Sequence, residues 1–195
     1  MKSIGIHLGR TKAIAAIEFN DLEVVRAEDN SPPDWTLTRS VVACRNNDLI
    51  VGEQGYNQLK VDPENVIFNI QLLIGRSFSD PVVQTQLSRV GYKIVPSSQS
   101  EENSIAVILG GNEYSPEEIS AEIIKKVIQN AQAYQEQVGQ KSKITQAVIT
   151  VPAYFNDKQR HATENAGIKA GLDKVKLLPK PTAAAISYGF QPDSE

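Results

Sequence analysis

A short apolar strand that runs into a tight turn near the start of the chain constrains this fold most. The segment is Ile4-Gly5-Ile6-His7-Leu8-Gly9-Arg10-Thr11-Lys12. Nucleotide-binding folds use such a strand and turn to present backbone amides and an acidic side chain to phosphate and magnesium. Here a histidine stands at the place of the metal-organising carboxylate, and Arg10 and Lys12 add two cations. The segment therefore predicts a phosphate-binding fold with altered chemistry.

The composition is that of a globular protein and excludes several function classes. The chain has 195 residues, of which 41% are hydrophobic and 22% charged, enough for one or two compact lobes. The net charge of −3 gives no reason to bind nucleic acid or an anionic membrane. No apolar run reaches the roughly 18 residues of a membrane span, no signal peptide is recognisable, and the single cysteine, Cys44, excludes an internal disulfide. We therefore expect a cytoplasmic protein.

The first part of the chain predicts strands followed by short elements. An antiparallel meander is expected over 3–8, 12–19 and 22–27, and a second hairpin joins 40–43 to 49–52. Weaker patterns predict three short helices and two strands, near 53–60, 66–74, 80–88, 92–95 and 105–109.

The last 80 or so residues carry the clearest patterns. Ser115-Pro116-Glu117-Glu118 predicts the start of a long amphipathic helix, because serine can cap it and Glu118 can complete a capping box. A buried strand over Ala147–Val151 ends at Pro152. A helix capped by Asn156, a strand and another helix are expected over 157–170, 175–178 and 182–188. This order indicates a mixed α/β layer structure.

Four segments together resemble a known family. They occur in the family's order over almost the whole chain, and they are Ile4–Thr11, Leu73-Ile74-Gly75-Arg76-Ser77-Phe78, Ala147–Ala170 with its core Val151-Pro152-Ala153-Tyr154-Phe155-Asn156-Asp157, and Pro181-Thr182-Ala183-Ala184-Ala185-Ile186-Ser187-Tyr188-Gly189. The chain thus closely resembles the seventy-kilodalton heat-shock chaperones of the DnaK type.

The resemblance implies a fold class and a division of the chain. The expected fold is α/β, an actin-like ATPase lobe with a ribonuclease-H-like core and an inserted α+β subdomain. Residues 1–39 and 113–195 would form the core, and residues 40–112 the insert. The chain stops before the family's second glycine-rich phosphate loop would appear, so we expect this lobe alone to lack the adenine pocket and the client-binding groove.

The resemblance also implies ligands and site residues. The family binds ATP or ADP with magnesium, and its partners are co-chaperones and unfolded protein clients in stress response. The phosphate turn corresponds to Gly9, Arg10, Thr11 and Lys12, of which the positions of Arg10 and Thr11 carry hydroxyls in the family. Only Thr11 retains one.

Three catalytic positions of the family are exchanged in this chain. The family has an Asp at His7 that helps to hold hydrated magnesium, and a Lys at Gln71 that stabilises the γ-phosphate and the attacking water. It has a Glu at Lys180 that sits by the metal and takes part in interdomain signalling. Because phosphoryl transfer depends on positioning and on compensating charge, we expect impaired or absent ATP hydrolysis, so whether the chain is an enzyme stays open.

The cations of the turn permit two interpretations. Arg10, Lys12 and Lys180 could converge and bind phosphate directly without magnesium. Alternatively, they are solvated or pair with acids such as Asp157 or Glu164. His7 is more typical of a hydrogen-bonded scaffold than of a metal ligand, so no metal site is expected.

Pro152 and Arg160 match a relay that couples nucleotide state to the substrate domain in the family. Because the relay's lysine and glutamate correspond to Gln71 and Lys180, we expect it to be broken; a strand terminator before a helix cap explains Pro152 equally well. Two function classes follow: a chaperone nucleotide-binding lobe with impaired hydrolysis, or a non-enzymatic scaffold or regulatory interaction module.

Overall fold

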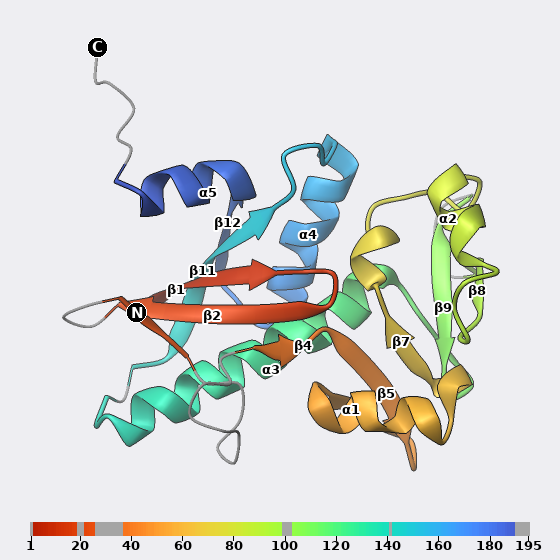
Figure 1. Cartoon of the computed structure of the whole chain (residues 1–195), viewed down its shortest axis with the longest axis horizontal. Helices are drawn as coiled ribbons and strands as arrows, with labels where there is room; N and C mark the ends of the chain where they lie inside the picture. Colours follow the sequence, from red (N-terminus) through yellow and green to blue (C-terminus); the bar gives the residue numbers. More distant parts are fainter. Residues whose placement is uncertain (1, 19–21, 26–36, 99–102, 141, 190–195) are drawn as a thin grey trace.

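A mixed six-stranded sheet forms the centre of the computed structural model, which describes residues 2–18, 22–25, 37–98, 103–140 and 142–189 (Figure 1). The strand order is β12-β11-β1-β2-β3, and β4 also pairs with β2. The strands are β1 (Lys2–Leu8), β2 (Lys12–Glu18), β3 (Leu22–Val24), β4 (Thr38–Arg39), β11 (Ile144–Val151) and β12 (Lys174–Pro179). Because β1, β11 and β12 are mutually parallel, their carboxyl ends meet at one edge of the sheet.

The alternation of side chains along β1 decides which residues reach solvent at that edge. Ile4, Ile6 and Leu8 are buried, whereas Gly5 and His7 are exposed. This period of two is what a strand with one buried face requires. His7 therefore lies on the open face, one residue before the end of its strand.

The chain between β4 and α3 forms two three-stranded antiparallel sheets, which Figure 1 draws at the right. The first has the order β6-β5-β7, with β5 at Val41–Arg45, β6 at Asp48–Val51 and β7 at Val66–Phe68. The second has the order β10-β9-β8, with β8 at Ile94–Pro96, β9 at Ile105–Leu109 and β10 at Asn112–Tyr114. Short helices accompany them, namely α1 (Glu53–Asn57), α2 (Pro81–Gln86) and the 3-10 turns η1 (Gln58–Lys60), η2 (Pro63–Asn65) and η3 (Ile70–Leu72).

The long helix α3 (Pro116–Gln137) joins these parts. It starts with a complete capping box between Ser115 and Glu118. Its buried stripe packs on β2 and on α4 (Asp157–Lys169), and α3 also contacts β5, β6 and β9. One hydrophobic core consequently runs from the main sheet through α3 into the smaller sheets. The last helix, α5 (Lys180–Ser187), follows β12 directly and buries no residue.

Most of the predicted elements are confirmed, including the α/β class, the meander over the described residues, the hairpin of β5 and β6, and both capped helices. Residue 19 of the second predicted strand and residues 26–27 of the third lie outside the described residues. The last strand begins one residue earlier than predicted, and the last helix two.

The prediction of a helix near 66–74 is wrong. Val66, Ile67 and Phe68 pair with β5 as a strand, because β-branched and aromatic side chains suit a pleated, half-buried surface. Asn69 then adopts a left-handed backbone with φ 57°, and only a 3-10 turn follows. The strand β10 was missed, although Gly110-Gly111, both with positive φ, form the two-residue turn that joins it to β9.

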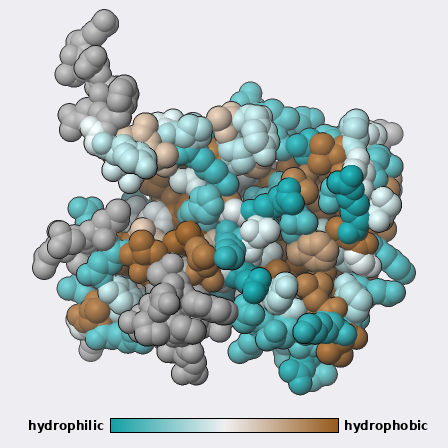
Figure 2. All heavy atoms as spheres, viewed as in Figure 1, coloured by the Kyte–Doolittle hydropathy of each residue, from teal (hydrophilic) through white to brown (hydrophobic). Residues whose placement is uncertain are grey.

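Hydrophilic residues cover most of the face drawn in Figure 2, and hydrophobic residues gather there in separate patches. Of the helices described, none combines the length and the apolar character that crossing a bilayer requires.

Candidate phosphate site

The turn between β1 and β2 is fixed by backbone hydrogen bonds rather than by its side chains. The Gly9 N–H donates to the Lys12 carbonyl at 3.0 Å. Ser40, which follows β4, donates from its hydroxyl to the Gly9 carbonyl and from its N–H to the Thr11 carbonyl, both at 2.9 Å. A Cβ atom on Gly9 would lie 2.4 Å from the Lys12 carbonyl oxygen, so this close approach admits only glycine.

Two residues from distant parts of the chain meet His7 at the end of β1. The parallel register places His7 opposite Thr150 of β11, and the Thr150 hydroxyl lies 3.2 Å from His7 Nδ1. From the start of α5, Lys180 Nζ donates to the Leu8 carbonyl at 3.4 Å. The carboxyl ends of β1, β11 and β12 thus bring His7, Thr150 and Lys180 together beside the turn.

Burial and a neighbouring charge favour the neutral imidazole here. Although His7 reaches solvent, partial burial lowers its pKa below 6.5, and the Lys180 ammonium lowers this pKa further. Burial also lowers the pKa of Lys180 from 10.5. No carboxylate among the described residues forms an ion pair with Lys180.

The other two cations flank the same turn. Arg10 and Lys12 are exposed, and Lys12 pairs with Arg39 in the ladder between β2 and β4. Within the described ranges, neither Arg10, Lys12 nor Lys180 forms an ion pair with Asp157 or Glu164. Of the two interpretations of these cations, pairing with those acids is therefore not what the structure has, and phosphate binding or solvation remains.

The residues present at the strand end do not fit magnesium. Mg²⁺ prefers carboxylate, carbonyl and water oxygens in octahedral geometry. Here the nearest carbonyl, that of Leu8, accepts from an ammonium, and the side chain beside it is an imidazole. In the part of the chain that the structure describes, no three His, Cys, Asp or Glu side chains gather to hold a metal ion. An anion fits this charge arrangement better than a cation does.

The side chain of Gln71 contacts helix α3 and not the end of β1. It lies in η3, and its side-chain amide donates to the hydroxyl of Ser120, a buried residue of α3, at 3.4 Å. The structure therefore ties Gln71 to α3, whereas it ties His7 and Lys180 to the end of β1.

Comparison with known proteins identifies the family of this chain. The sequence profile described as Hsp70 protein matches residues 3–195. The chain belongs to the Hsp70 family. It is 42% identical over 97% of its length to the chaperone protein DnaK of two strains of Thermus thermophilus. It is 40% identical, again over 97%, to the chaperone protein DnaK of Psychrobacter cryohalolentis. It covers 28–29% of the length of these relatives.

Pro152, in the loop between β11 and α4, and Arg160, in α4, are the two residues that resemble the Hsp70 relay. Pro152 follows β11, and its carbonyl accepts from the Phe155 N–H at 3.2 Å. The Arg160 guanidinium, from α4, donates to the carbonyls of Phe155 at 3.0 Å and Ala153 at 3.3 Å. Arg160 therefore holds the loop that connects β11 to α4, which is a sufficient structural role for it.

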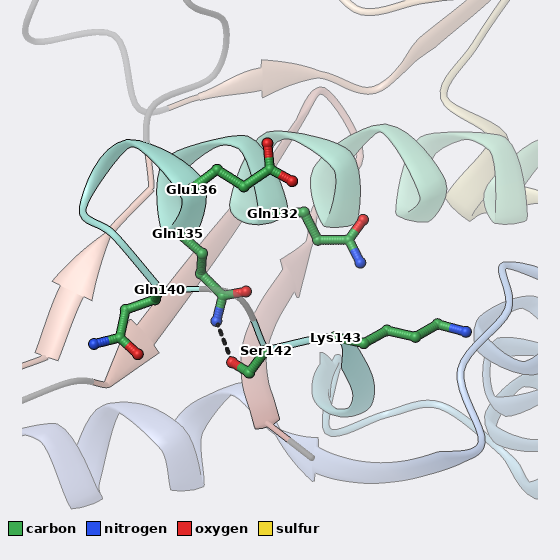
Figure 3. A pocket seen from close by; sticks show the side chains of 6 residues that line it. All are labelled: Gln132, Gln135, Glu136, Gln140, Ser142 and Lys143. Carbon is green, nitrogen blue, oxygen red and sulfur yellow. Dashed lines mark hydrogen bonds between the residues drawn. The ribbon is translucent and has the colours of Figure 1, made fainter.

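A pocket of about 490 Å³ lies away from the phosphate turn, at the end of α3 (Figure 3). Its described lining consists of Gln132, Gln135, Glu136, Gln140, Ser142 and Lys143. Gln135 and Ser142 point toward one another and form a hydrogen bond of 3.3 Å, while Lys143 extends away from them. None of these residues belongs to the turn or to the strand ends, so we assign this pocket no part in the candidate site.

Ser40, Thr150 and the Leu8 carbonyl are site components that the sequence analysis missed. Their contacts join residues 31, 143 and 172 positions apart, which no local pattern reveals. For Thr150, the sequence offered only the predicted strands over 3–8 and 147–151. If these two strands pair in parallel with their ends aligned, His7 and Thr150, each one residue before the end of its strand, lie opposite one another.

Proposed function

We propose that this chain is a nucleotide-binding lobe of the DnaK type whose turn at Gly9–Lys12 binds phosphate groups without magnesium. The observation that carries the proposal is the position of Lys180, whose ammonium lies 3.4 Å from the Leu8 carbonyl beside His7. This places a cation at the strand end where the family resemblance implies a metal and its carboxylates. Arg10 and Lys12 supply further positive charge to the same turn.

We further propose that the lobe does not accelerate ATP hydrolysis. Electrostatic stabilisation of the transferring phosphoryl group requires charges that are positioned before the reaction. With His7, Gln71 and Lys180 at the three degenerate positions, this chain has no intact set of such groups, and Gln71 is bonded to Ser120 instead. Pro152 and Arg160 then serve the loop before α4 rather than a relay.

The other parts of the proposal rest on the family. We propose Gly9, Arg10, Thr11 and Lys12 as the phosphate-binding residues, and residues 40–112 as an inserted subdomain, although β10 continues two residues beyond that boundary. Because the relatives are named chaperone proteins, we propose unfolded proteins and co-chaperones as partners, in the cytoplasm and in stress response.

Calorimetric titration with ATP, with magnesium and then with a chelator, tests phosphate binding. We expect saturable binding that survives chelation and weakens in the double variant His7→Asp, Lys180→Glu. The variant Lys176→Glu is a matched control, because Lys176 is exposed on β12, which β11 separates from β1. Binding that requires magnesium, or that the double variant leaves unchanged, contradicts the proposal.

A second measurement tests hydrolysis. We expect phosphate release from ATP at the background rate for the parent chain and for Thr11→Ala alike. A parent rate that is clearly above background and falls in Thr11→Ala would overturn this part of the proposal.

One observation favours the alternative function of a non-enzymatic interaction module. The last helix, α5, buries no residue, and Ile186 and Tyr188 are 54% and 93% exposed. If neither ATP nor phosphate binds, while Ile186→Ser abolishes binding of a partner, the interaction module becomes the better description.

A further inference from the structure

A pocket of about 390 Å³ opens beside the phosphate turn, at the junction of the main sheet and the smaller sheets. Its described lining residues are Arg10, Thr11, Arg39, Ser40, Val41, Tyr56, Leu59, Phe68 and Asn69. The volume lies within the range of pockets that hold small molecules. Arg10 and Thr11 therefore belong both to the turn and to the mouth of a cavity that the phosphate-binding proposal does not use.

The walls of this pocket are held in place by contacts that do not depend on a ligand. Ser40 binds the carbonyls of Gly9 and Thr11, which fixes the wall against the turn. Among the other lining residues, the Arg39 guanidinium lies 3.8 Å from the centre of the Tyr56 ring, and Arg39 donates to Glu53 at 2.5 Å. Arg39 and Tyr56 thus form a cation–π pair, and an aromatic ring beside a guanidinium suits another planar group.

The floor of the pocket is apolar. Val41 is buried, and Leu59 and Phe68 are partly buried against the small cluster that Val41 forms with Ala43 and Val66. Tyr56 is 39% exposed, so an aromatic surface remains open at the edge. A ring placed here would be removed from water against these side chains, which is favourable.

Three polar side chains that line the pocket are free to bind a ligand, and the only charge among them is positive. Among the described residues, the Arg10 guanidinium, the Thr11 hydroxyl and the Asn69 side-chain amide have no hydrogen-bond partner. The described lining contains two arginines and no carboxylate. Arg39 is already paired with Glu53, so Arg10 is the cation left for a ligand. Its fork of N–H donors matches a phosphate or carboxylate group.

We propose that this pocket binds a small aromatic anion, with its phosphate or carboxylate at Arg10 and Thr11 and its ring between Tyr56, Leu59 and Phe68. The inference rests on the proposed phosphate site only through Arg10 and Thr11. It goes beyond that site because the pocket gives this lobe an apolar subsite of its own, built by β4, β5, α1, η1 and β7.

Three probes separate the ring from the anion in calorimetric titrations of the chain with a chelator present. They are inorganic phosphate, phenyl phosphate and phenol. Because burying a ring adds favourable free energy to that of the anion, we expect phenyl phosphate to bind about tenfold more tightly than phosphate. Phenol, which lacks the anion, should bind more weakly than phenyl phosphate. Adenosine monophosphate, as a fourth probe, tells a nucleotide source from a simple aryl source of the same chemistry.

Two exposed tyrosines supply the matched variants. Tyr56→Ala removes one wall, and we expect it to bring the affinity of phenyl phosphate down to that of inorganic phosphate without changing the latter. Tyr188→Ala removes a tyrosine that is 93% exposed and far along the chain, and it should leave both affinities unchanged. Amide chemical-shift changes at Leu59 and Asn69 on titration of the parent with phenyl phosphate give a readout that needs no variant.

The outcomes distinguish this inference from the proposed function. If phosphate binds and phenyl phosphate binds no more tightly, the aromatic subsite is wrong while the phosphate site stands. If phenyl phosphate binds in a Tyr56-dependent manner and phosphate alone does not, the pocket stands and the turn by itself is no phosphate site. If neither anion binds, both fail.

Discussion

The turn at Gly9–Lys12 and the strand-loop-helix segment at Ile144–Lys169 use their side chains in opposite ways. In the second segment the side chains build the structure, since Asn156 and Gln159 form a capping box and Arg160 bonds to two loop carbonyls. In the turn the backbone builds the structure, and Arg10, Thr11 and Lys12 are exposed. The turn can therefore change its chemistry without losing its shape, whereas the second segment has little such freedom.

The largest effect on stability is expected at Gly9, the first residue of the turn. In Gly9→Ala, the new Cβ would lie 2.4 Å from a backbone oxygen and 3.0 Å from His7 Nε2, so the turn has to move. We expect the free energy of unfolding to fall by about 2–4 kcal/mol, measured by denaturant unfolding. Gly5→Ala is the control, because its Cβ would meet nothing closer than 3.9 Å. Equal effects of the two substitutions would mean that the backbone does not define the turn.

The cap of α4 gives the next effect, in the other region. Asn156 accepts from the Gln159 N–H at 2.9 Å, and Asn156→Ala leaves that donor without its partner. We expect a loss of about 1 kcal/mol in the free energy of unfolding. Asn156→Ser, which can cap, should lose much less. If alanine and serine behave alike, the side chains of this segment matter less than the comparison requires.

Features set by local sequence could be predicted, whereas contacts made across the fold could not. The capping box at Ser115, the cap at Asn156 and the buried strand before Pro152 were predictable, because their signals lie within a few residues of each element. The strand at Val66–Phe68 was not, because its pairing with β5 is made across the fold. At the site, the turn and its cations were predictable. The contacts of Ser40 and Thr150 depend on strand register and were not.

A smaller effect on stability is expected from the protonation of His7, at the end of the strand that leads into the turn. Burial and Lys180 hold its folded-state pKa below 6.5, so the unfolded state binds the proton more readily. The stability linked to neutral His7 is complete above pH 6.5 and is lost as the pH falls through the lower folded-state pKa.

We therefore expect the free energy of unfolding to fall on acidification from about pH 7.5 to pH 5.5, and to fall less in His7→Gln. Urea unfolding of both chains at the two pH values measures the difference, in which the contribution of the other histidine cancels. The same slope in both chains would show that its surroundings do not hold His7 neutral.

The smallest effect on stability is expected where the effect on binding is largest. Arg10 is exposed and has no partner among the described residues, so Arg10→Ala should change the free energy of unfolding by no more than about 0.5 kcal/mol. Arg39, one strand away, donates to Glu53 and stacks on Tyr56, and Arg39→Ala should cost about 1 kcal/mol. Phosphate binding should show the reverse order, because only Arg10 is left uncommitted. Denaturant unfolding and phosphate titration of the same two variants measure both quantities. If Arg10→Ala destabilises the chain as much as Arg39→Ala, the side chains of the turn also hold the fold, and the distinction between the two regions fails.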